Sequence, residues 1–478
     1  MNKYKKLLGN TAIFGIGSFL SKIIGFFLTA LYTHNMSEGE FSTAELIYST
    51  VNMLVPVVTF SMADAVIRFG MDKAYDRRKV FTAANAALLM GMTLFMLFTP
   101  LVSTNVRIGK YSFVLYLYCF FCCFRQIASQ YVRARGYVKL FMADGVVAVF
   151  NQLILNLILI VGFKLGVTGY VLSFVISDCI SIVWLTLLAR LDKCIDTRFF
   201  DIDLFKEMLK FSAPLIPTYV LWWVTSASDR WFVVEMVGET ENGIYSIGYK
   251  LPNLILLVTT MFYQAWQMSS IEERDSKDLG KFYQNVFGAY SSVLFIAAAG
   301  LIMLVKPLTM VLTGDGSNGT HFYEAYLFTP ILIISMLFQC CCQFLSSIYS
   351  TRKRSLNSLF TALVAAVTNV VLNLILIKKH GMWGAAIATA CSYFACFAVR
   401  LFDARRIIYF RVNYIRLIVN TLIVVIMAIL VGTEAKLWVL WVILLFAICC
   451  VYNLGALYKT IKRILYKKGG KPRISADA

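Results

Sequence analysis

Histidine is scarce in this chain of 478 residues. Only His34, His321 and His380 occur, and all three fall in short polar segments between long apolar stretches. A histidine-based metal site or a buried histidine base therefore has no residues to use. The chain also lacks the Gly-rich loop ending in Gly-Lys-Ser/Thr that cradles nucleotide phosphates, so ATP hydrolysis is not expected. We predict no catalytic residue, no metal site and no cofactor.

Charged residues are few as well. They make up 15% of the chain against 59% hydrophobic residues, and this balance cannot cover a water-soluble body of this size. A hydrocarbon core of about 30 Å requires roughly 20 apolar residues per helix. The sequence therefore predicts an all-α integral membrane protein with 14 transmembrane helices. They lie near residues 7–33, 42–68, 80–102, 111–132, 140–162, 167–189, 208–236, 243–270, 282–305, 323–350, 355–377, 382–400, 413–433 and 437–458.

Cysteine is absent from every loop that is predicted to lie outside the cell when both termini are cytoplasmic. The 12 cysteines lie within the predicted helices, except for Cys194 in a cytoplasmic segment. A disulfide framework is therefore not expected. No histidine or carboxylate stands at ligand spacing from the cysteines, so their sulfur atoms are interpreted as packing groups rather than metal ligands.

The net charge of +19 would fit a nucleic-acid partner, but the distribution of the charges favours membrane topology. Of the 45 Lys and Arg residues, 32 lie in the N-terminal segment, in alternate loops and in the C-terminal tail, and only 7 lie in the other loops. Basic loops stay in the cytoplasm, so both termini are predicted to be cytoplasmic. The basic tail is then explained by topology and by contact with membrane lipids, without nucleic acid.

One hexapeptide occurs twice. Leu155–Ile160 recurs letter for letter at Leu372–Ile377, 217 residues later, and a Gly-x-x-Gly follows each copy. The glycines are Gly166 and Gly169 in the first copy and Gly381 and Gly384 in the second. Internal repeats in a multi-pass membrane protein indicate a transporter whose binding site lies between two related halves.

The repeat predicts two pseudo-symmetric six-helix lobes. The N-terminal lobe is residues 1–189, with helices 1 to 6, and the C-terminal lobe is residues 208–402, with helices 7 to 12. Residues 190–207 form a cytoplasmic crossover connector between them. Helices 13 and 14, at 403–458, have no counterpart in the repeat, and residues 459–478 form the basic cytoplasmic tail.

Two short stretches carry a resemblance to a known family. They are the basic start Lys5-Lys6-Leu7-Leu8-Gly9-Asn10-Thr11 before a Gly/Ser-rich helix, and Gly381-Met382-Trp383-Gly384-Ala385-Ala386-Ile387-Ala388 at the start of helix 12. With 14 helices, the chain resembles the polysaccharide-transport family of O-antigen-type flippases for lipid-linked oligosaccharides. This family belongs to the MOP superfamily, with lipid II flippases and MATE multidrug antiporters. The resemblance implies a V-shaped bundle around a central cavity, a bacterial cell membrane location, and polymerase and glycosyltransferase partners.

Four basic residues inside predicted helices are the candidate substrate-binding groups. A charge within the membrane is costly, so it normally faces a cavity or a partner. Lys and Arg in such a cavity can hold the pyrophosphate of a lipid-linked sugar. Two alternatives stay open: the first lysine can reach outward to the interface, and the first arginine can reach lipid headgroups. The four candidates are Lys22, Arg125, Arg230 and Lys250.

Three acidic residues inside predicted helices are candidate ion-coupling groups. Asp178 lies near the midpoint of helix 6 and is interpreted as an isolated carboxylate that binds a proton or sodium, or as a neutral core acid. Asp229 directly precedes Arg230 in helix 7. Asp64 stands four residues before Arg68, so these two side chains are expected to neutralise one another on one helical face.

Three functions fit these residues. The first is a flippase that moves a polyprenyl-pyrophosphate oligosaccharide from the cytoplasmic to the outer leaflet by alternating access, for which the basic residues are needed. The second is a MATE-type cation-coupled multidrug antiporter, which would use the acidic residues. The third, a flippase for lipid II or another peptidoglycan precursor, has the same substrate chemistry as the first. A purely structural membrane scaffold is disfavoured by the buried charges.

Overall fold

The computed structural model describes residues 24–25, 27–72, 74–194, 196–256, 259, 262–263, 266, 279–316, 321–352 and 354–468. Every regular element in these ranges is a helix, which confirms the all-α class. Ten of the described helices are long and apolar enough to cross a membrane. The count of 14 spans stays a prediction, in part because the first span and the eighth are described only in part.

The described residues form two compact units. The first unit is drawn from residues 1–250, 309–325 and 362–389, and the second from residues 251–308, 326–361 and 390–478. Two helices contribute to both units. They are α14 (Val305–Thr313) and α16 (Ser355–Ile407).

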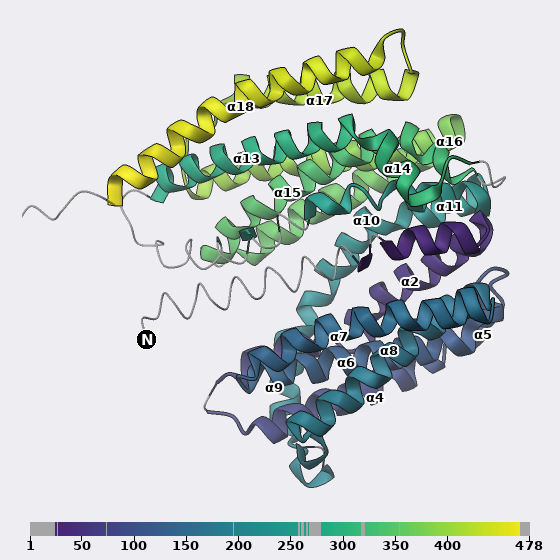
Figure 1. Cartoon of the computed structure of the whole chain (residues 1–478). Coiled ribbons are helices and arrows are strands. Elements are labelled where there is room, and N and C mark those ends of the chain that lie inside the picture. The colour runs from purple at the N-terminus through teal and green to yellow at the C-terminus, as the bar shows by residue number, and fades with distance from the viewer. Residues whose placement is uncertain are drawn as a thin grey trace, which may run out of the picture. The chain divides into compact units, whose positions relative to one another are not determined.

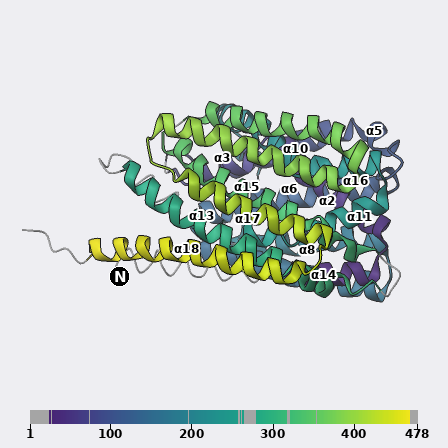
Figure 2. The same cartoon turned by 90° about the horizontal axis from the view of Figure 1, so that it is seen from above.

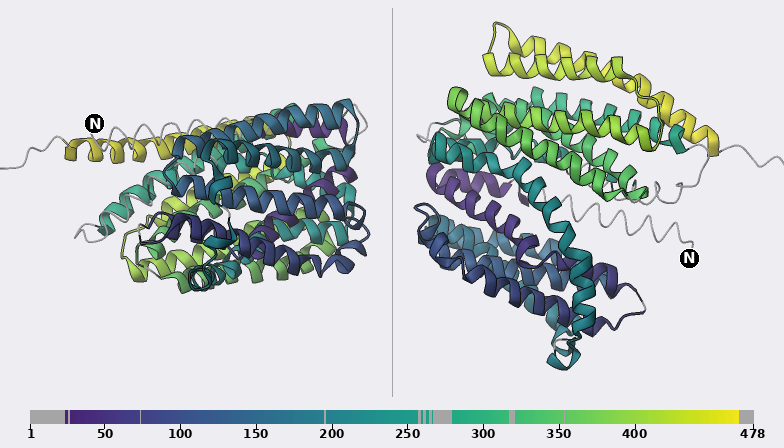
Figure 3. Two further views of the ribbon diagram at one scale, coloured as in Figure 1. Left: turned by 90° about the horizontal axis from the view of Figure 1, so that it is seen from below. Right: turned by 180° about the vertical axis from the view of Figure 1, so that it is seen from behind.

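In the first unit, α6 lies at the centre of a helical bundle and packs against α2, α3, α4, α7 and α8. Figure 1 shows α4, α6, α7 and α8 side by side, and the left view of Figure 3 shows the same bundle from below. α11 and α10 pack against α2. The helices of this unit are α2 (Glu38–Val58), α3 (Met62–Gly70), α4 (Arg77–Met96), α5 (Thr99–Ser103), α6 (Ser112–Ala134), α7 (Val138–Asn156), α8 (Gly166–Ala189), α9 (Ile202–Ser212), α10 (Ile216–Met236) and α11 (Glu239–Gly248), with short turns η1 (Gly109–Tyr111), η2 (Leu157–Gly162), η3 (Leu191–Cys194), η4 (Thr197–Phe199) and η5 (Ala213–Leu215).

The span predicted at 42–68 is not one helix. It breaks between α2 and α3, where Phe60 and Ser61 both adopt the left-handed conformation, with φ of 50° and 54°. α4 packs directly on this break, because a Cβ added to Gly91 would overlap the carbonyl oxygen of Val58. A glycine at this position is therefore required for the close approach of the two helices.

The first glycine of the repeated Gly-x-x-Gly has a positive φ in both copies. Gly166 and Gly381 have φ of +51° and +53°, so each reverses the chain in a conformation that favours glycine. Gly381 is the kink within α16, and it separates the spans predicted at 355–377 and 382–400. Gly169 and Gly384 each pack against a leucine carbonyl of the preceding helix. These carbonyls belong to Leu159 and Leu376, which stand 217 residues apart like the two hexapeptides.

In the second unit, α13 (Leu279–Met303) packs against α15 (Thr329–Thr351), α17 (Tyr414–Thr433) and α18 (Trp438–Lys468), and η6 (Phe322–Leu327) spans the boundary between the units. Figure 2 and the right view of Figure 3 show α17 and α18 as an antiparallel pair alongside α13. Inside this pair, the amides of Asn420 and Asn453 exchange hydrogen bonds of 3.1 and 2.8 Å. Arg416 donates to Asn453 and to Ser292 of α13, so these polar contacts tie the three helices together.

Candidate functional site

Two of the predicted substrate-binding residues lie in the first unit close to an acid that the sequence analysis did not select. Lys250, just after α11, forms an ion pair of 2.7 Å with Glu45 of α2. Tyr170 of α8 donates a hydrogen bond of 3.1 Å to the same carboxylate oxygen. The Glu45 side chain is only 3% exposed, so its negative charge is buried next to the charge of Lys250. We call Glu45, Tyr170, Arg230 and Lys250 the Glu45 cluster.

Arg230 of α10 belongs to this cluster through its charge rather than through a hydrogen bond. Its guanidinium lies 5.2 Å from the ring centroid of Tyr249, and Glu45 is within electrostatic range. Its Nε is buried and has no hydrogen-bond partner among the described residues, and no carboxylate there lies within ion-pair distance. The side chain as a whole is half-buried. Arg230 therefore presents a positive charge that is available to an anion.

Asp229 points away from Arg230, as adjacent residues of a helix do. It is fully buried, and one of its oxygens, Oδ2, accepts hydrogen bonds of 2.7, 2.6 and 2.6 Å from Tyr245, Tyr249 and Thr389. The other oxygen, Oδ1, is buried without a partner in the part of the chain that the structure describes. An acid with one oxygen held by three hydroxyl groups and the other oxygen open can take up a proton or a cation.

Arg125 and Asp178, predicted separately, form one ion-pair network. Arg125 of α6 lies 2.8 Å from Asp178 of α8 and 3.1 Å from Asp144 of α7. The acid side chains are 7% and 3% exposed, whereas Arg125 is 26% exposed. Asp178 is therefore not the isolated carboxylate that its sequence position indicated. With two carboxylates and one guanidinium, this network holds one more negative charge than positive charges when all three groups are ionised.

The expected pairing of Asp64 with Arg68 is wrong. The carboxylate of Asp64 accepts a hydrogen bond of 2.9 Å from Tyr219 of α10, and Arg68 forms an ion pair of 3.6 Å with Asp72. Because α3 starts only at Met62, after the break, Arg68 lies in its last turn and reaches the loop that follows. Lys22 lies outside the described residues.

Three charged residues that are buried in the described part of the chain were not expected from the sequence. Glu45 and Asp144 stand near the ends of their predicted spans, where charged side chains usually reach the interface. Arg400 was assigned to the edge of the span at 382–400, yet it is fully buried and donates hydrogen bonds to the hydroxyl of Thr361 and the carbonyl of Cys342. The predicted spans contain unequal numbers of basic and acidic residues. This inequality could have indicated that some of the basic residues pair with acids near the ends of the spans.

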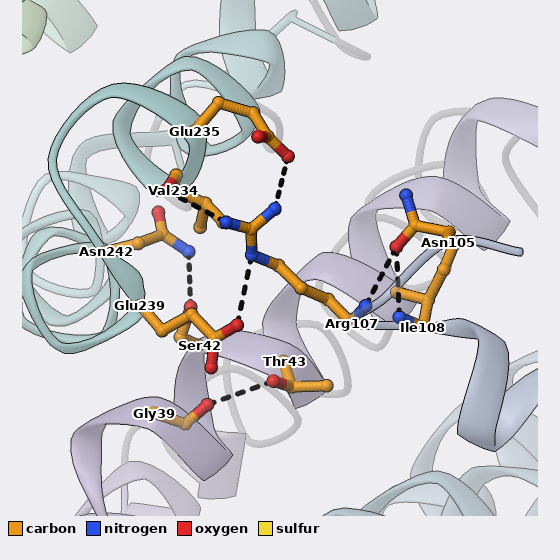
Figure 4. A network of polar contacts seen from close by, with 10 residues as sticks. All are labelled: Gly39, Ser42, Thr43, Asn105, Arg107, Ile108, Val234, Glu235, Glu239 and Asn242. Carbon is orange, nitrogen blue, oxygen red and sulfur yellow. Dashed lines mark hydrogen bonds and ion pairs between the residues drawn. The ribbon is translucent and has the colours of Figure 1, made fainter.

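A further polar cluster connects the loop after α5 with α10 and α11. Arg107, in the loop after α5, pairs with Glu235 at the end of α10 and with Glu239 at the start of α11, the latter at 3.0 Å (Figure 4). The side chain of Asn105 fixes this loop by accepting hydrogen bonds from the backbone N–H groups of Arg107 and Ile108. The predicted topology places this cluster on the outer side of the membrane. No group of His, Cys, Asp and Glu in the described ranges is arranged to hold a metal ion.

Comparison with known proteins agrees with a helical transporter. The family described as polysaccharide biosynthesis protein matches residues 7–267 of the chain. None of the curated proteins matches it. Among solved structures, the lipid II flippase MurJ in an inward closed conformation is similar over 94% of this chain and 99% of its own, with a TM-score of 0.69 and 17% identity.

Two MATE structures share the fold as well. An inward-facing multidrug resistance MATE family transporter of the MOP superfamily covers 82% of this chain and 95% of its own, with a TM-score of 0.65 and 14% identity. A MATE protein in its straight conformation covers 85% and 96%, with a TM-score of 0.59 and 14% identity. The chain thus shares the all-helical fold of these membrane transporters. The match spans more than half of the sequence, and the chain belongs to the polysaccharide biosynthesis protein family.

Proposed function

We propose that this protein is a flippase that moves a polyprenyl-pyrophosphate oligosaccharide from the cytoplasmic to the outer leaflet during synthesis of a cell-surface polysaccharide. The observation that carries the proposal is Arg230, a half-buried guanidinium with no acidic partner in the described residues. A pyrophosphate supplies several anionic oxygens that can accept its N–H groups in pairs. A site for organic cations would place an acid at this position instead.

Lys250 is proposed as the second substrate-binding residue, and Glu45 as its partner in the absence of substrate. The ion pair of 2.7 Å neutralises Lys250 within the membrane until an anion arrives. A phosphate that replaces Glu45 as partner would loosen the contact between α2 and α11. Substrate binding would then change a helix–helix contact, which is the differential interaction that a conformational change requires.

Coupling to an ion gradient is assigned to the acids rather than to these two basic residues. Asp229 has a buried oxygen without a partner in the described ranges, and Asp178 shares Arg125 with a second carboxylate. Arg125 is thereby committed to acids, which favours a role in coupling over a role in substrate binding. Lys22 is retained as a proposed substrate-binding residue on its sequence position alone.

The proposed transport cycle involves both predicted lobes of the protein. The lobes 1–189 and 208–402 would alternate between inward and outward access in a bacterial cell membrane, with both termini cytoplasmic. Glycosyltransferases that build the oligosaccharide and a polymerase that consumes it would be the functional partners. The acids Asp229 and Asp178 also fit a MATE-type antiporter, and the experiment below separates the two functions.

The test is translocation of a labelled undecaprenyl-pyrophosphate oligosaccharide in proteoliposomes that contain the purified protein. Arg230→Ala is expected to lower the rate at least tenfold, whereas Arg230→Lys retains part of it because the charge remains. Arg68→Ala is the matched control, since it removes an exposed arginine whose ion pair in the described ranges is with Asp72. Wild-type rates in Arg230→Ala would refute the role of Arg230. Ethidium efflux by the wild type under a sodium or proton gradient, without lipid translocation, would establish the antiporter instead.

A further inference from the structure

A basic cavity lies in the first unit, away from the Glu45 cluster and from the Arg125 network. It has a volume of about 520 Å³ and is formed where α4 begins and where α6 and α8 end. Five of its lining side chains are basic and two are acidic. The basic residues are Arg77, Arg78, Arg135, Arg190 and Lys193. The proposed function uses none of them.

The two acids of this cavity are engaged elsewhere. Asp76 caps the N-terminus of α4 by accepting a hydrogen bond of 2.8 Å from the backbone N–H of Arg78. Asp72 accepts the backbone N–H of Ala74 at 3.0 Å and pairs with Arg68, which lies outside the cavity lining. Within the described residues, no carboxylate lies within ion-pair distance of any of the five basic side chains. The cavity therefore has an uncompensated positive charge.

Three of the guanidinium groups are held in place by the protein. Arg77 donates a hydrogen bond of 3.2 Å to the carbonyl of Gly70. Arg135 donates a hydrogen bond of 2.6 Å to the carbonyl of Ala189, and its guanidinium lies 5.1 Å from the ring centroid of Tyr137. Arg78 lies 5.4 Å from the ring centroid of Phe199. Such contacts reduce the conformational entropy that is lost when a ligand binds.

The start of α4 adds to the positive potential. Arg77 and Arg78 occupy the first turn of this 20-residue helix, whose first N–H groups form the positive end of the helix dipole. Basic side chains at this end are unfavourable by themselves, whereas an anion is stabilised there. Asp76 already caps this helix end through the N–H of Arg78, so a negatively charged ligand would chiefly compensate the side chains of Arg77 and Arg78.

We propose that this cavity binds a phosphate-bearing anion. Arginine side chains match phosphate oxygens in a bidentate fashion, and the volume admits a headgroup-sized ligand. The cavity lies at the ends of α4, α6 and α8, three helices that are long and apolar enough to span the membrane. The ends of spanning helices are where lipid headgroups would lie. The predicted topology places these ends on the cytoplasmic side. The phosphate can belong to an anionic phospholipid or to a soluble phosphate compound.

The test compares the full-length protein in nanodiscs of phosphatidylcholine with the same protein in nanodiscs that also contain phosphatidylglycerol. The double variant Arg190→Ala/Lys193→Ala removes two cavity charges. The control Lys206→Ala/Lys210→Ala removes two exposed charges from α9, outside the cavity. Retention of phosphatidylglycerol is measured by native mass spectrometry, and inorganic pyrophosphate is titrated in phosphatidylcholine nanodiscs with the thermal unfolding midpoint as readout.

Each basic group near a phosphate is worth roughly fivefold in affinity, so the cavity variant is expected to bind about 30-fold more weakly. The control variant should bind like the wild type. Loss of phosphatidylglycerol from the cavity variant alone identifies a lipid headgroup as the ligand. Loss of the pyrophosphate response alone identifies a soluble phosphate compound.

Equal binding of both probes by the wild type, the cavity variant and the control variant would overturn the proposal. Proper folding of the variant is checked by its unfolding midpoint in phosphatidylcholine without ligand. If that midpoint falls, Arg78→Gln takes its place, because Arg78 is exposed and its guanidinium lies over the ring of Phe199. Wild-type binding of both probes by Arg78→Gln would then decide against a cavity site.

Discussion

Removing Arg125 should destabilise the protein far more than removing either acid that it contacts. Arg125→Gln leaves the carboxylates of Asp144 and Asp178, whose side chains are 3% and 7% exposed, without a cation. Breaking a buried ion pair in this way costs about 3–5 kcal/mol. Asp178→Asn instead leaves one guanidinium with one carboxylate, and the new amide oxygen still accepts a hydrogen bond. Its expected cost is about 1 kcal/mol.

This asymmetry follows from the count of charges and can be measured directly. Equilibrium unfolding in mixed detergent and SDS micelles, followed by the fluorescence of the eight tryptophans, reports the free energy of unfolding. Arg68→Gln is the control, because its ion pair is exposed and worth at most about 1 kcal/mol. Equal losses for Arg125→Gln and Asp178→Asn would refute the reasoning, as would a loss for Arg125→Gln no larger than for the control.

Three further outcomes are expected. Arg107→Ala removes two partly exposed ion pairs, so hydrogen exchange of residues 234–243 should rise about fivefold, and unchanged exchange would contradict the proposed connection. Gly384→Ala forces a Cβ into a backbone carbonyl and should cost about 3 kcal/mol in the unfolding assay, whereas Gly145→Ala meets open space and should be neutral or slightly stabilising. Hydrogen bonds from Lys306 and a tyrosine lower the pKa of Glu434. Its stabilisation is therefore present above the unfolded value of about 4.3 and lost as the pH falls below it, and Glu434→Gln should flatten that part of the pH profile of the unfolding midpoint.

The class of fold was predictable because the membrane imposes it. Apolar stretches of roughly 20 residues can only be helices in a hydrocarbon core, so composition and length suffice. The Gly-x-x-Gly repeat was informative as well, since its first glycines, Gly166 and Gly381, share a positive φ. The break at Phe60 and Ser61 was not predictable, because neither residue is a glycine and the left-handed conformation depends on the packing of α4.

The residue types of the candidate site were predictable, but their partners were not. Lys250 contacts Glu45 across 205 positions of sequence, and Arg125 contacts Asp178 across 53. Such pairs depend on the rotation of each helix about its axis, which is set by neighbouring helices rather than by local sequence. The sequence therefore identified basic and acidic residues within the membrane without indicating which of them neutralise one another.

The two predicted halves share some features of the repeat and differ in their chemistry. Asn156 and Asn373, at equivalent positions of the repeat, are both buried and both donate to the residue four positions earlier. By contrast, Asp178 lies 12 residues after Gly166 in the first copy, and the residue 12 positions after Gly381 in the second copy is the uncharged Tyr393. The first half thus holds an ion-pair network with excess acid, whereas the acid Asp229 of the second half is held by hydroxyl groups. A proton or cation at Asp178 would lie next to a guanidinium, whereas one at Asp229 would lie next to hydroxyl groups. We therefore expect the two halves to contribute different steps to transport.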